Sequence, residues 1–313
     1  MPRKRHGLIM SNKTPKMRAP RSQTIPKTLE TINWGTAFAA FIYPAFGAGL
    51  LGAIMSFGLL TEQITLQTYY IPLTIGAIIV SILICNSGIG PLHRIMQHRA
   101  GELSKAGQFV TMIMLIIAMQ GTVREWVNYH SQHHRFADES GDPHNPFESK
   151  LWAWVGWILF RDEKDCARPM ALWLKNSPII VKMDNIYLQI SCLIHFALPA
   201  LIYLAVWAAG GSLVVTALLH SGFVIGRAMQ FHATNYGINV LGHLKTPKWA
   251  DYAMALLTGG EAFHDHHHAE PQSALHLPRK GILNRLFDYN GTLLLVYEKL
   301  GWLKETKIAP RYA

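Results

Sequence analysis

Histidine is the residue type whose number and spacing in this chain could do chemistry. The 313 residues include 16 histidines, and most of them fall in three short motifs, HRIMQH, HSQHH and HDHHH. Neutral imidazole is the commonest metal ligand at cellular pH. Histidines that recur in short motifs therefore indicate a metal centre rather than isolated structural residues.

Two of the motifs contain histidines at positions i, i+3 and i+4, which are His130, His133 and His134 in one and His264, His267 and His268 in the other. On a helix the second and third members return to the face of the first, one on each side of it. Each trio could therefore serve one metal ion or straddle two. His266 is the member of HDHHH that we expect to point away.

The motif HRIMQH has a different spacing. Its histidines, His93 and His98, are five residues apart. On an α-helix this places them about 140 degrees apart around the axis. The two side chains would therefore serve different metals or lie at a distorted helix end.

The composition indicates a membrane protein. Half of the chain is hydrophobic and its mean hydropathy is +0.15, which is too apolar for an ordinary soluble enzyme. The three cysteines form no CxxC pair, so neither a disulfide framework nor a thiolate zinc site is expected. The net charge is +10, but the basic residues are not interleaved with aromatic ones as on a nucleic-acid-binding module, so no nucleic-acid partner is expected.

Four apolar stretches approach the length of about 20 residues that a membrane-spanning helix needs. They cover residues 34–60, 70–89, 186–209 and 213–230. Short connections join the first to the second and the third to the fourth. We therefore expect an all-α integral membrane protein with four transmembrane helices in two hairpins. A basic tail, residues 1–33, would precede a single membrane domain, residues 34–313.

The charges predict how the chain lies in the membrane. None of the 29 Lys and Arg residues falls in either short hairpin loop, so both termini and the long middle segment should be cytoplasmic. A fifth apolar run, residues 109–119, is too short for a span, and we interpret it as an interfacial or re-entrant helix. If it crossed, the first two histidine motifs would lie on opposite sides of the membrane and could not share a metal centre.

Longer stretches around these motifs resemble membrane fatty acyl desaturases of the acyl-CoA desaturase type. The resemblance covers roughly residues 70–305 and rests on HRIMQH, WVNYHSQHHRFADESGDPHNP, VGW, NVLGH and GEAFHDHHH. It implies a cytoplasmic cap of helices on four transmembrane helices, with a di-iron centre that nine histidines bind. Carried over position by position, these are His93, His98, His130, His133, His134, His243, His264, His267 and His268. The resemblance adds His243 to the motif histidines, and it suggests that Asn239 holds a water near one iron.

The same resemblance implies an activity, which is the oxygen-dependent desaturation of a fatty acyl chain. The cofactors would be two Fe²⁺ ions, with O₂ as co-substrate. The substrate would be a fatty acyl thioester or an intact lipid in the bacterial inner membrane or the endoplasmic reticulum. Because the chain shows no haem or flavin module, its two electrons would come from a separate cytochrome, ferredoxin or rubredoxin-type donor.

Other functions remain open at this point. A hydroxylase or acetylenase acting on a lipid chain would use the same histidines. A divalent-metal transporter would need ligands near the middle of the membrane, whereas these motifs lie outside the predicted spans. The remaining histidines are expected to be structural, namely His6, His144, His195, His220, His232, His266 and His276. The sequence leaves open the position of the double bond, the chain length, the carrier of the chain and the oligomeric state.

Overall fold

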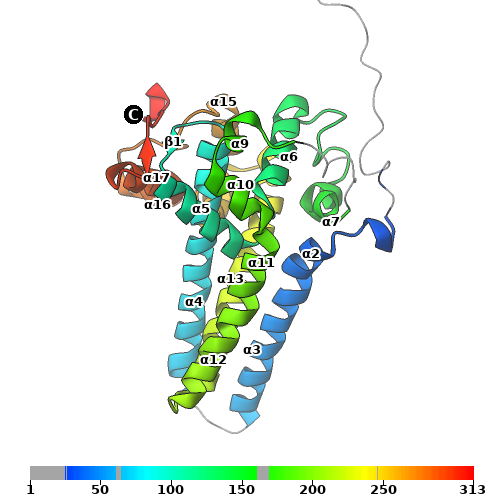
Figure 1. Ribbon diagram of the computed structural model, residues 1–313, viewed down its shortest axis with the longest axis vertical. Helices are drawn as coiled ribbons and strands as arrows, with labels where there is room; N and C mark the ends of the chain where they lie inside the picture. Colours follow the sequence, from blue (N-terminus) through cyan, green and yellow to red (C-terminus); the bar gives the residue numbers. More distant parts are fainter. Residues whose placement is uncertain (1–24, 26, 61–64, 161–168, 245) are drawn as a thin grey trace, which may run out of the picture.

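Long helices form a bundle, and shorter helices cover one of its ends (Figure 1). The computed structural model describes residues 25, 27–60, 65–160, 169–244 and 246–313. Within these residues the fold is almost entirely helical, which confirms the prediction of an all-α membrane protein. Most of the predicted basic tail, residues 1–33, lies outside the described residues.

Four helices are long and apolar enough to cross a membrane, and they cover Trp34–Phe57, Tyr69–Gln97, Tyr187–Ala208 and Leu213–His243. The first is built from α2 (Trp34–Ala37), η2 (Phe38–Ile42) and α3 (Tyr43–Leu60), and the second from α4 (Thr65–Gly90) and η3 (Pro91–Gln97). The third comprises α11 (Tyr187–Cys192), η5 (Leu193–Ala197) and α12 (Leu198–Ala208), and the fourth α13 (Leu213–Ala233), η6 (Thr234–Ile238) and η7 (Leu241–His243). The four predicted spans are thus confirmed. The second and fourth run beyond their apolar stretches, because each helix continues to the histidines at its end.

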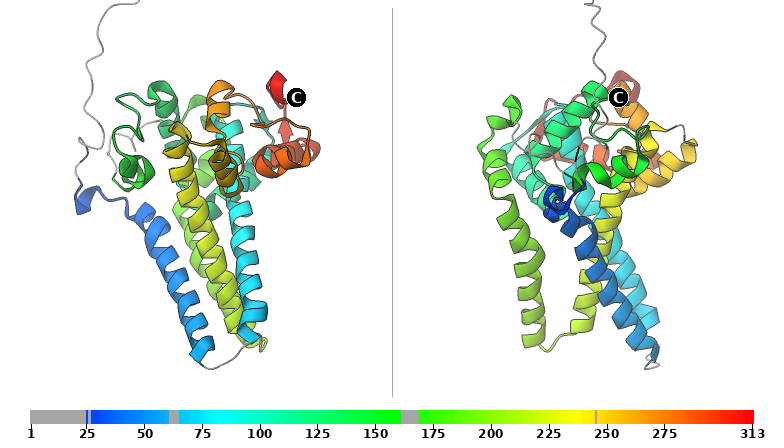
Figure 2. Two further views of the ribbon diagram at one scale, coloured as in Figure 1. Left: turned by 180° about the vertical axis from the view of Figure 1, so that it is seen from behind. Right: turned by 90° about the vertical axis from the view of Figure 1, so that its right-hand side faces the viewer.

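Helix α13 lies at the centre of the bundle, where it packs against α4 and α3 (Figure 2). A small residue makes the contact with α4 close, because a Cβ added at Gly222 would lie 2.7 Å from the carbonyl oxygen of Thr74. Glycine is common where membrane helices approach closely, since it lets the two backbones pack together. The second and fourth spans therefore form a tight pair on which the histidine-bearing segments are built.

The short apolar run forms the helix α5 (Lys105–Ala118). It packs on α4 at Gly88, where an added Cβ would lie 2.7 Å from the backbone nitrogen of Leu115. At Met119 the backbone takes φ 54°, and the chain then turns by 84° into α6 (Val123–Phe136). The bent pair returns to the covered end of the bundle in Figure 1, as a re-entrant element does.

The covering layer, which we call the cap, consists of short helices and one small sheet. Its other helices are η1 (Leu29–Thr31), η4 (Trp152–Gly156), α7 (Trp157–Leu159), α9 (Leu172–Lys175), α10 (Pro178–Asn185), α14 (Lys248–Thr258), α15 (His264–Ala269), α16 (Ile282–Phe287), α17 (Tyr289–Lys299) and η8 (Pro310–Tyr312). The strands β1 (Glu102–Leu103) and β2 (Leu303–Lys304) pair antiparallel, with Glu102 opposite Lys304. This pairing ties the C-terminal segment to the loop that follows the first histidine motif.

Candidate metal centre

The first histidine motif lies on a π-helical continuation of the second span. In η3 the hydrogen bonds join residues five apart, and the backbone N–H of His98 donates to the carbonyl oxygen of His93 over 3.2 Å. Residues five apart in a π-helix are joined by its backbone hydrogen bonds and lie on successive turns, toward the same side of the helix. Of the two alternatives for HRIMQH, the distorted helix end is therefore the one that the structure adopts.

Polar groups at the start of α6 position the second motif. The side chain of Thr122 accepts a hydrogen bond from the backbone of Glu125 over 3.3 Å. The carboxylate of Asp184 accepts further bonds from the backbone N–H groups of Val123 and Arg124, over 2.6 and 3.1 Å. An anionic group at a helix N-terminus satisfies free N–H groups and complements the helix dipole. These contacts fix the direction in which α6 presents its histidines.

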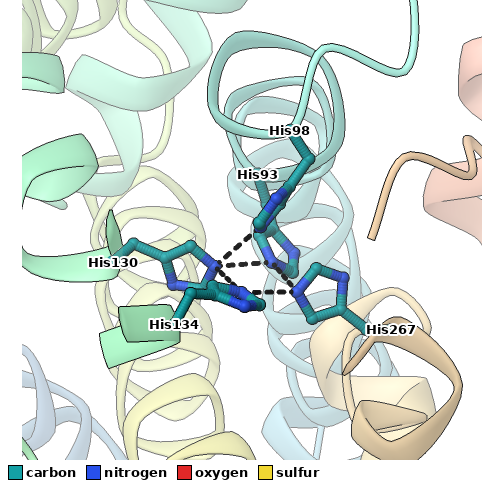
Figure 3. A group of neighbouring side chains, drawn as sticks. All are labelled: His93, His98, His130, His134 and His267. Carbon is teal, nitrogen blue, oxygen red and sulfur yellow. Dashed lines mark hydrogen bonds between the residues drawn. The ribbon is translucent and has the colours of Figure 1, made fainter. Parts of the chain in front are cut away.

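Five histidine side chains meet at one point near the cap (Figure 3), and they are His93, His98, His130, His134 and His267. We call them the five-histidine group. The Nε2 atom of His130 lies 3.1 Å from that of His93 and 3.0 Å from that of His98. The Nε2 atom of His134 lies 3.0 Å from those of His130 and His267. The Nε2 atoms of histidines from η3, from the residue that follows it, and from α6 and α15 therefore lie close together in this group.

Four more histidines form a second cluster beside the first, and they are His133, His243, His264 and His268. We call them the four-histidine group. The Nε2 atom of His264 lies 2.8 Å from that of His243 and 2.9 Å from that of His268. The Nε2 atoms of His133 and His268 are 3.4 Å apart. Helices α6 and α15 each contribute histidines to both groups. The three histidines of each of these two motifs are therefore divided between the two clusters.

Three of the nine histidines have a carboxylate next to the Nδ1 atom of the ring. One of them belongs to the five-histidine group and two belong to the four-histidine group. The Nδ1 atom of His93 lies 2.7 Å from Glu261, that of His133 lies 3.0 Å from Asp142, and that of His243 lies 2.8 Å from Asp138. An ionised carboxylate can only accept, so each of these rings carries a hydrogen on Nδ1, and in the neutral form of the ring this leaves a lone pair on Nε2. The lone pairs point toward the other histidines of the group, where a cation would be bound.

Glu261 belongs to a buried charge network. Its Oε1 atom accepts hydrogen bonds from Arg94 Nε over 3.0 Å and from Asn290 Nδ2 over 2.9 Å. The guanidinium of Arg94 also lies 2.8 Å from Asp288. Burial raises the pKa of Glu261, but Arg94 and the neighbouring histidines outweigh it and hold that pKa well below its usual range. Glu261 therefore stays ionised and keeps the His93 ring in one orientation.

The electrostatics favour neutral imidazoles around both clusters. Burial and the neighbouring histidines lower the pKa of His264 and His267 well below the usual value, and they lower that of His268 to about 4. Burial raises the pKa of Asp142, but the hydrogen bond from His133 and the nearby His144 outweigh it, and the net value is about 2. Neutral rings backed by an ionised carboxylate are the state in which histidine binds a metal.

A narrow cavity of about 110 Å³ runs past both groups. Its lining includes His93 and His130 from the five-histidine group and His133 and His264 from the four-histidine group. Apolar side chains make up much of the remaining wall, among them Ile89, Met119, Trp126, Phe231 and Ile238. Asn239 also lines this cavity, and its side-chain nitrogen lies 3.5 Å from the carbonyl oxygen of Ala153.

Three further histidines lie near the groups without joining them. His266 turns away, since its Nδ1 atom contacts the carbonyl oxygen of His276 over 2.8 Å. His276 is fully buried, with its Nδ1 atom 3.1 Å from the carbonyl oxygen of Gly260. The ring of His144 stacks on that of His133, with centroids 4.4 Å apart, and lies 3.7 Å from Asp142. His144 is thus closer to the centre than an isolated structural residue would be.

The motif spacing does not select the three carboxylates. Glu261 and His264 form an ExxH pair, but the second pair of a carboxylate-bridged di-iron bundle is missing from the sequence, so the spacing gives Glu261 no role. Asp138 and Asp142 follow the second motif within nine residues of His133. Acidic residues so close to a histidine motif are a signal that could have identified them, because histidine ligands commonly donate to carboxylates.

Comparisons with known proteins identify relatives of the chain. No family model matches it. The "Delta-9 desaturase-like 2 protein" of Arabidopsis thaliana is 30% identical over 69% of this chain and 70% of the relative. The "sn-1 stearoyl-lipid 9-desaturase" of Synechocystis is 28% identical over 74% of this chain and 71% of the relative. The "Probable acyl-CoA desaturase" of Schizosaccharomyces pombe is 27% identical over 67% of this chain, but the match spans only 44% of that longer protein.

All three relatives are named as desaturases, and two of the names give a fatty acyl substrate, carried on coenzyme A in one and on a lipid in the other. The matched region is most of this chain, and the first two relatives match over more than two thirds of their own length. A polytopic helical membrane fold with clustered histidines agrees with such an oxidoreductase. The chain belongs to the fatty acyl desaturase family.

Proposed function

We propose that this protein introduces a double bond into a fatty acyl chain, with O₂ as the oxidant and one iron ion at each histidine group. The observation that carries the proposal is the convergence of nine imidazole nitrogens in two adjacent clusters beside an apolar cavity. The acyl chain loses two hydrogen atoms as the double bond forms. These hydrogens, with two electrons and two protons from outside, reduce O₂ to two molecules of water.

The donor set fits iron. Two nitrogens bound at right angles to one ion at about 2.1 Å lie about 3.0 Å apart, whereas a tetrahedral ion separates them by about 3.4 Å. Seven Nε2–Nε2 distances within the two groups are 2.8–3.1 Å, and an eighth, between His133 and His268, is 3.4 Å. This supports an ion with more than four ligand positions, such as Fe²⁺, over a structural zinc. When bound, the iron pair would supply the one chemistry that side chains lack, which is the activation of O₂ for removing hydrogen from an unactivated methylene.

The protein's own part in the reaction is to bind and position the chain. Apolar side chains such as Ile89, Trp126 and Phe231 line the cavity and would hold one stretch of methylene groups beside both clusters. The same walls exclude water from the reacting carbon atoms. The carboxylates of Glu261 and Asp142 hold the rings of His93 and His133 in place, so that little reorganisation is needed during turnover.

Several further features belong to this proposal. We propose that Asn239 holds a water molecule near the four-histidine group, since it lines the same cavity as His133 and His264. Residues 34–313 would act as one membrane domain with both termini on the cytoplasmic side. A separate cytochrome, ferredoxin or rubredoxin-type protein would deliver the electrons at the cap. The membrane would be the bacterial inner membrane or the endoplasmic reticulum.

The test is product and metal analysis on the purified full-length protein in lipid nanodiscs. The preparation is supplied with O₂ and a reduced ferredoxin, and the acyl products are identified by mass spectrometry. We expect a new double bond and about two iron ions per chain. A hydroxylated product without a double bond would assign the protein to the hydroxylase alternative. Bound zinc in place of iron, with no oxidised product, would contradict the proposed chemistry.

A further inference from the structure

A second cavity adjoins the one at the histidines and leads sideways toward the bilayer. It has a volume of about 570 Å³ and lies between the beginning of the first span and the beginning of the third. Residues that line both cavities include Asn33, Thr36, Met119, Gly121 and Glu125. The two spaces therefore adjoin each other along these shared residues, and the inner one borders the metal groups.

The outer of the two cavities is open to the hydrocarbon region. Leu188 and Phe196 of the third span line the second cavity, and they are 69% and 48% exposed on the outside of the bundle. Cys192 lies between them and is also exposed. A third, almost wholly apolar cavity of about 730 Å³ continues along the first, third and fourth spans and shares Phe38 and Phe196 with the second. Figure 2 shows the third span (α11–α12) standing apart from α3 on this side.

The polar residues shared by the two cavities lie where the first span begins. Trp34 and Tyr187 are the first residues of the first and third spans, next to the cap. Asn33 and Thr36, which line both cavities, flank Trp34. If the spans begin at the edge of the hydrocarbon core, the glycerol ester of a membrane lipid would lie near these residues. Its acyl chain could bend into the two cavities while the head group stays at the interface.

The described side chains at this opening include no cation that would bind a carrier rich in phosphate. Among the described residues that line the first two cavities, the side chains with a full charge are the carboxylates of Glu125 and Glu261, and no Lys or Arg lines either space. Phosphate groups are normally bound by Arg, Lys or free backbone N–H groups. A chain that moves sideways from the bilayer also avoids exposing its methylene groups to water, which is unfavourable for each group.

We propose that the acyl chain reaches the histidine groups laterally, between the first and third spans, while it is esterified in a membrane lipid. This inference rests on the proposed function and names the substrate class of the same site. The portal consists of Phe38, Leu188, Cys192 and Phe196 on the membrane side and leads past Asn33 and Thr36 to the histidines.

The first experiment compares three carriers of the same deuterated stearoyl chain. The full-length iron-loaded protein, in nanodiscs with a reduced ferredoxin, receives the chain in phosphatidylglycerol, as stearoyl-CoA or as stearoyl-acyl carrier protein. We expect the lipid-borne chain to be oxidised at least ten times faster than either thioester. Equal or faster oxidation of a thioester would overturn the lateral route and leave the proposed function standing. Oxidation of none of the three would overturn the proposed function, and this inference with it.

The second experiment obstructs the portal. In a Cys166→Ser background, Cys192 is alkylated with a bulky maleimide, while Cys85 is fully buried. We expect at least a tenfold lower rate on lipid-borne chains, with the iron content unchanged. The matched control carries Cys192→Ser and Leu204→Cys, because Leu204 is 58% exposed on α12 but lies outside the lining of the second and third cavities. Each rate is divided by that of the same unlabelled variant, and equal effects at the two positions would overturn the portal.

Discussion

The two histidine groups are neighbours with different surroundings. The five-histidine group borders the narrow cavity, and His93 is anchored by Glu261, whose side chain is 1% exposed. The four-histidine group borders that cavity too, but three of its members also line a polar space of about 760 Å³ on the other side. One of its carboxylate partners, Asp138, is 42% exposed. The same ligand type therefore occurs in an enclosed setting and in an open one.

This difference predicts a division of tasks between the two proposed ions. A site with five ligands and a buried carboxylate is expected to hold its metal firmly and rigidly. A site with four ligands beside a polar space has room for water and for exchange with solvent. We expect the four-histidine group to be the one at which small molecules enter and leave, and the predictions below test this contrast.

The largest effects should follow from removing one ligand of each group. His267→Ala in the five-histidine group and His264→Ala in the four-histidine group should each lower the rate of acyl oxidation by about 100-fold or more, because a metal ligand is lost outright. Iron analysis should show that each variant retains the ion of the intact group. Loss of both ions from either variant would mean that the clusters form a single cooperative site.

The second largest effects should come from the carboxylates. Glu261→Gln and Asp142→Asn remove one negative charge each from behind a ligand and should lower iron affinity or activity by about 10 to 100-fold. We expect the greater loss for Glu261→Gln, since it also leaves the buried Arg94 without one of its two carboxylate partners. Competition with a calibrated chelator would measure both affinities. A greater loss of iron affinity for Asp142→Asn would contradict the expectation that the carboxylate of the enclosed five-histidine group matters more.

Acid should destabilise the iron-free protein. The fully buried His276 has a pKa lowered from 6.5 to about 4 by burial and by Arg94, and His268 has a pKa of about 4. The unfolded chain therefore binds more protons than the folded one between these values, and the free energy of unfolding should fall as the pH drops from about 6.5 to about 4. His276 alone would contribute about 3 kcal/mol to that loss. Thermal unfolding of the iron-free protein across this range measures it, and a midpoint that rises on acidification would contradict the assignment of neutral rings.

The two groups should also differ in the rate at which a chelator removes their ions, which is a smaller effect than the preceding ones. Because the wide polar space reaches His243, His264 and His268, a hydrophilic chelator should remove one ion quickly and the second slowly. His264→Ala should lack the fast phase, whereas His267→Ala should lack the slow one. A single phase in the unmodified protein would remove the distinction between an open and an enclosed site.

The smallest effect is expected for His266→Ala. This ring turns away from both groups and contacts the carbonyl oxygen of His276. Its loss should lower stability by about 1 kcal/mol, the usual contribution of one hydrogen bond, with unchanged iron content and activity. It is the matched control for His264→Ala and His267→Ala because it lies on the same helix. Loss of iron from this variant would show that the helix rather than its ligands determines binding.

The sequence predicted the spans well because hydropathy is a local property. Each of the four apolar stretches corresponds to one span, and the short run at residues 109–119 forms one arm of a helix pair bent by 84°. The division of the nine histidines into five and four could not be predicted. It depends on how η3, α6 and α15 meet in space, which is set by packing between distant segments. The role of Glu261 was equally hidden, since its partners His93 and Arg94 lie more than 160 residues away.

The π-helical end of the second span shows that motif spacing can report the pitch of the helix that carries it. In HRIMQH the five-residue interval matches the wider turn of η3, whereas the intervals of three and four in the other motifs match α-helices. Deleting one residue between His93 and His98 should let this segment rewind as an α-helix. The span would keep its length, but the two rings would converge from a different angle on the same ion. The number of residues between two histidines in such a motif thus indicates whether the helix that carries them is wound as an α-helix or a π-helix.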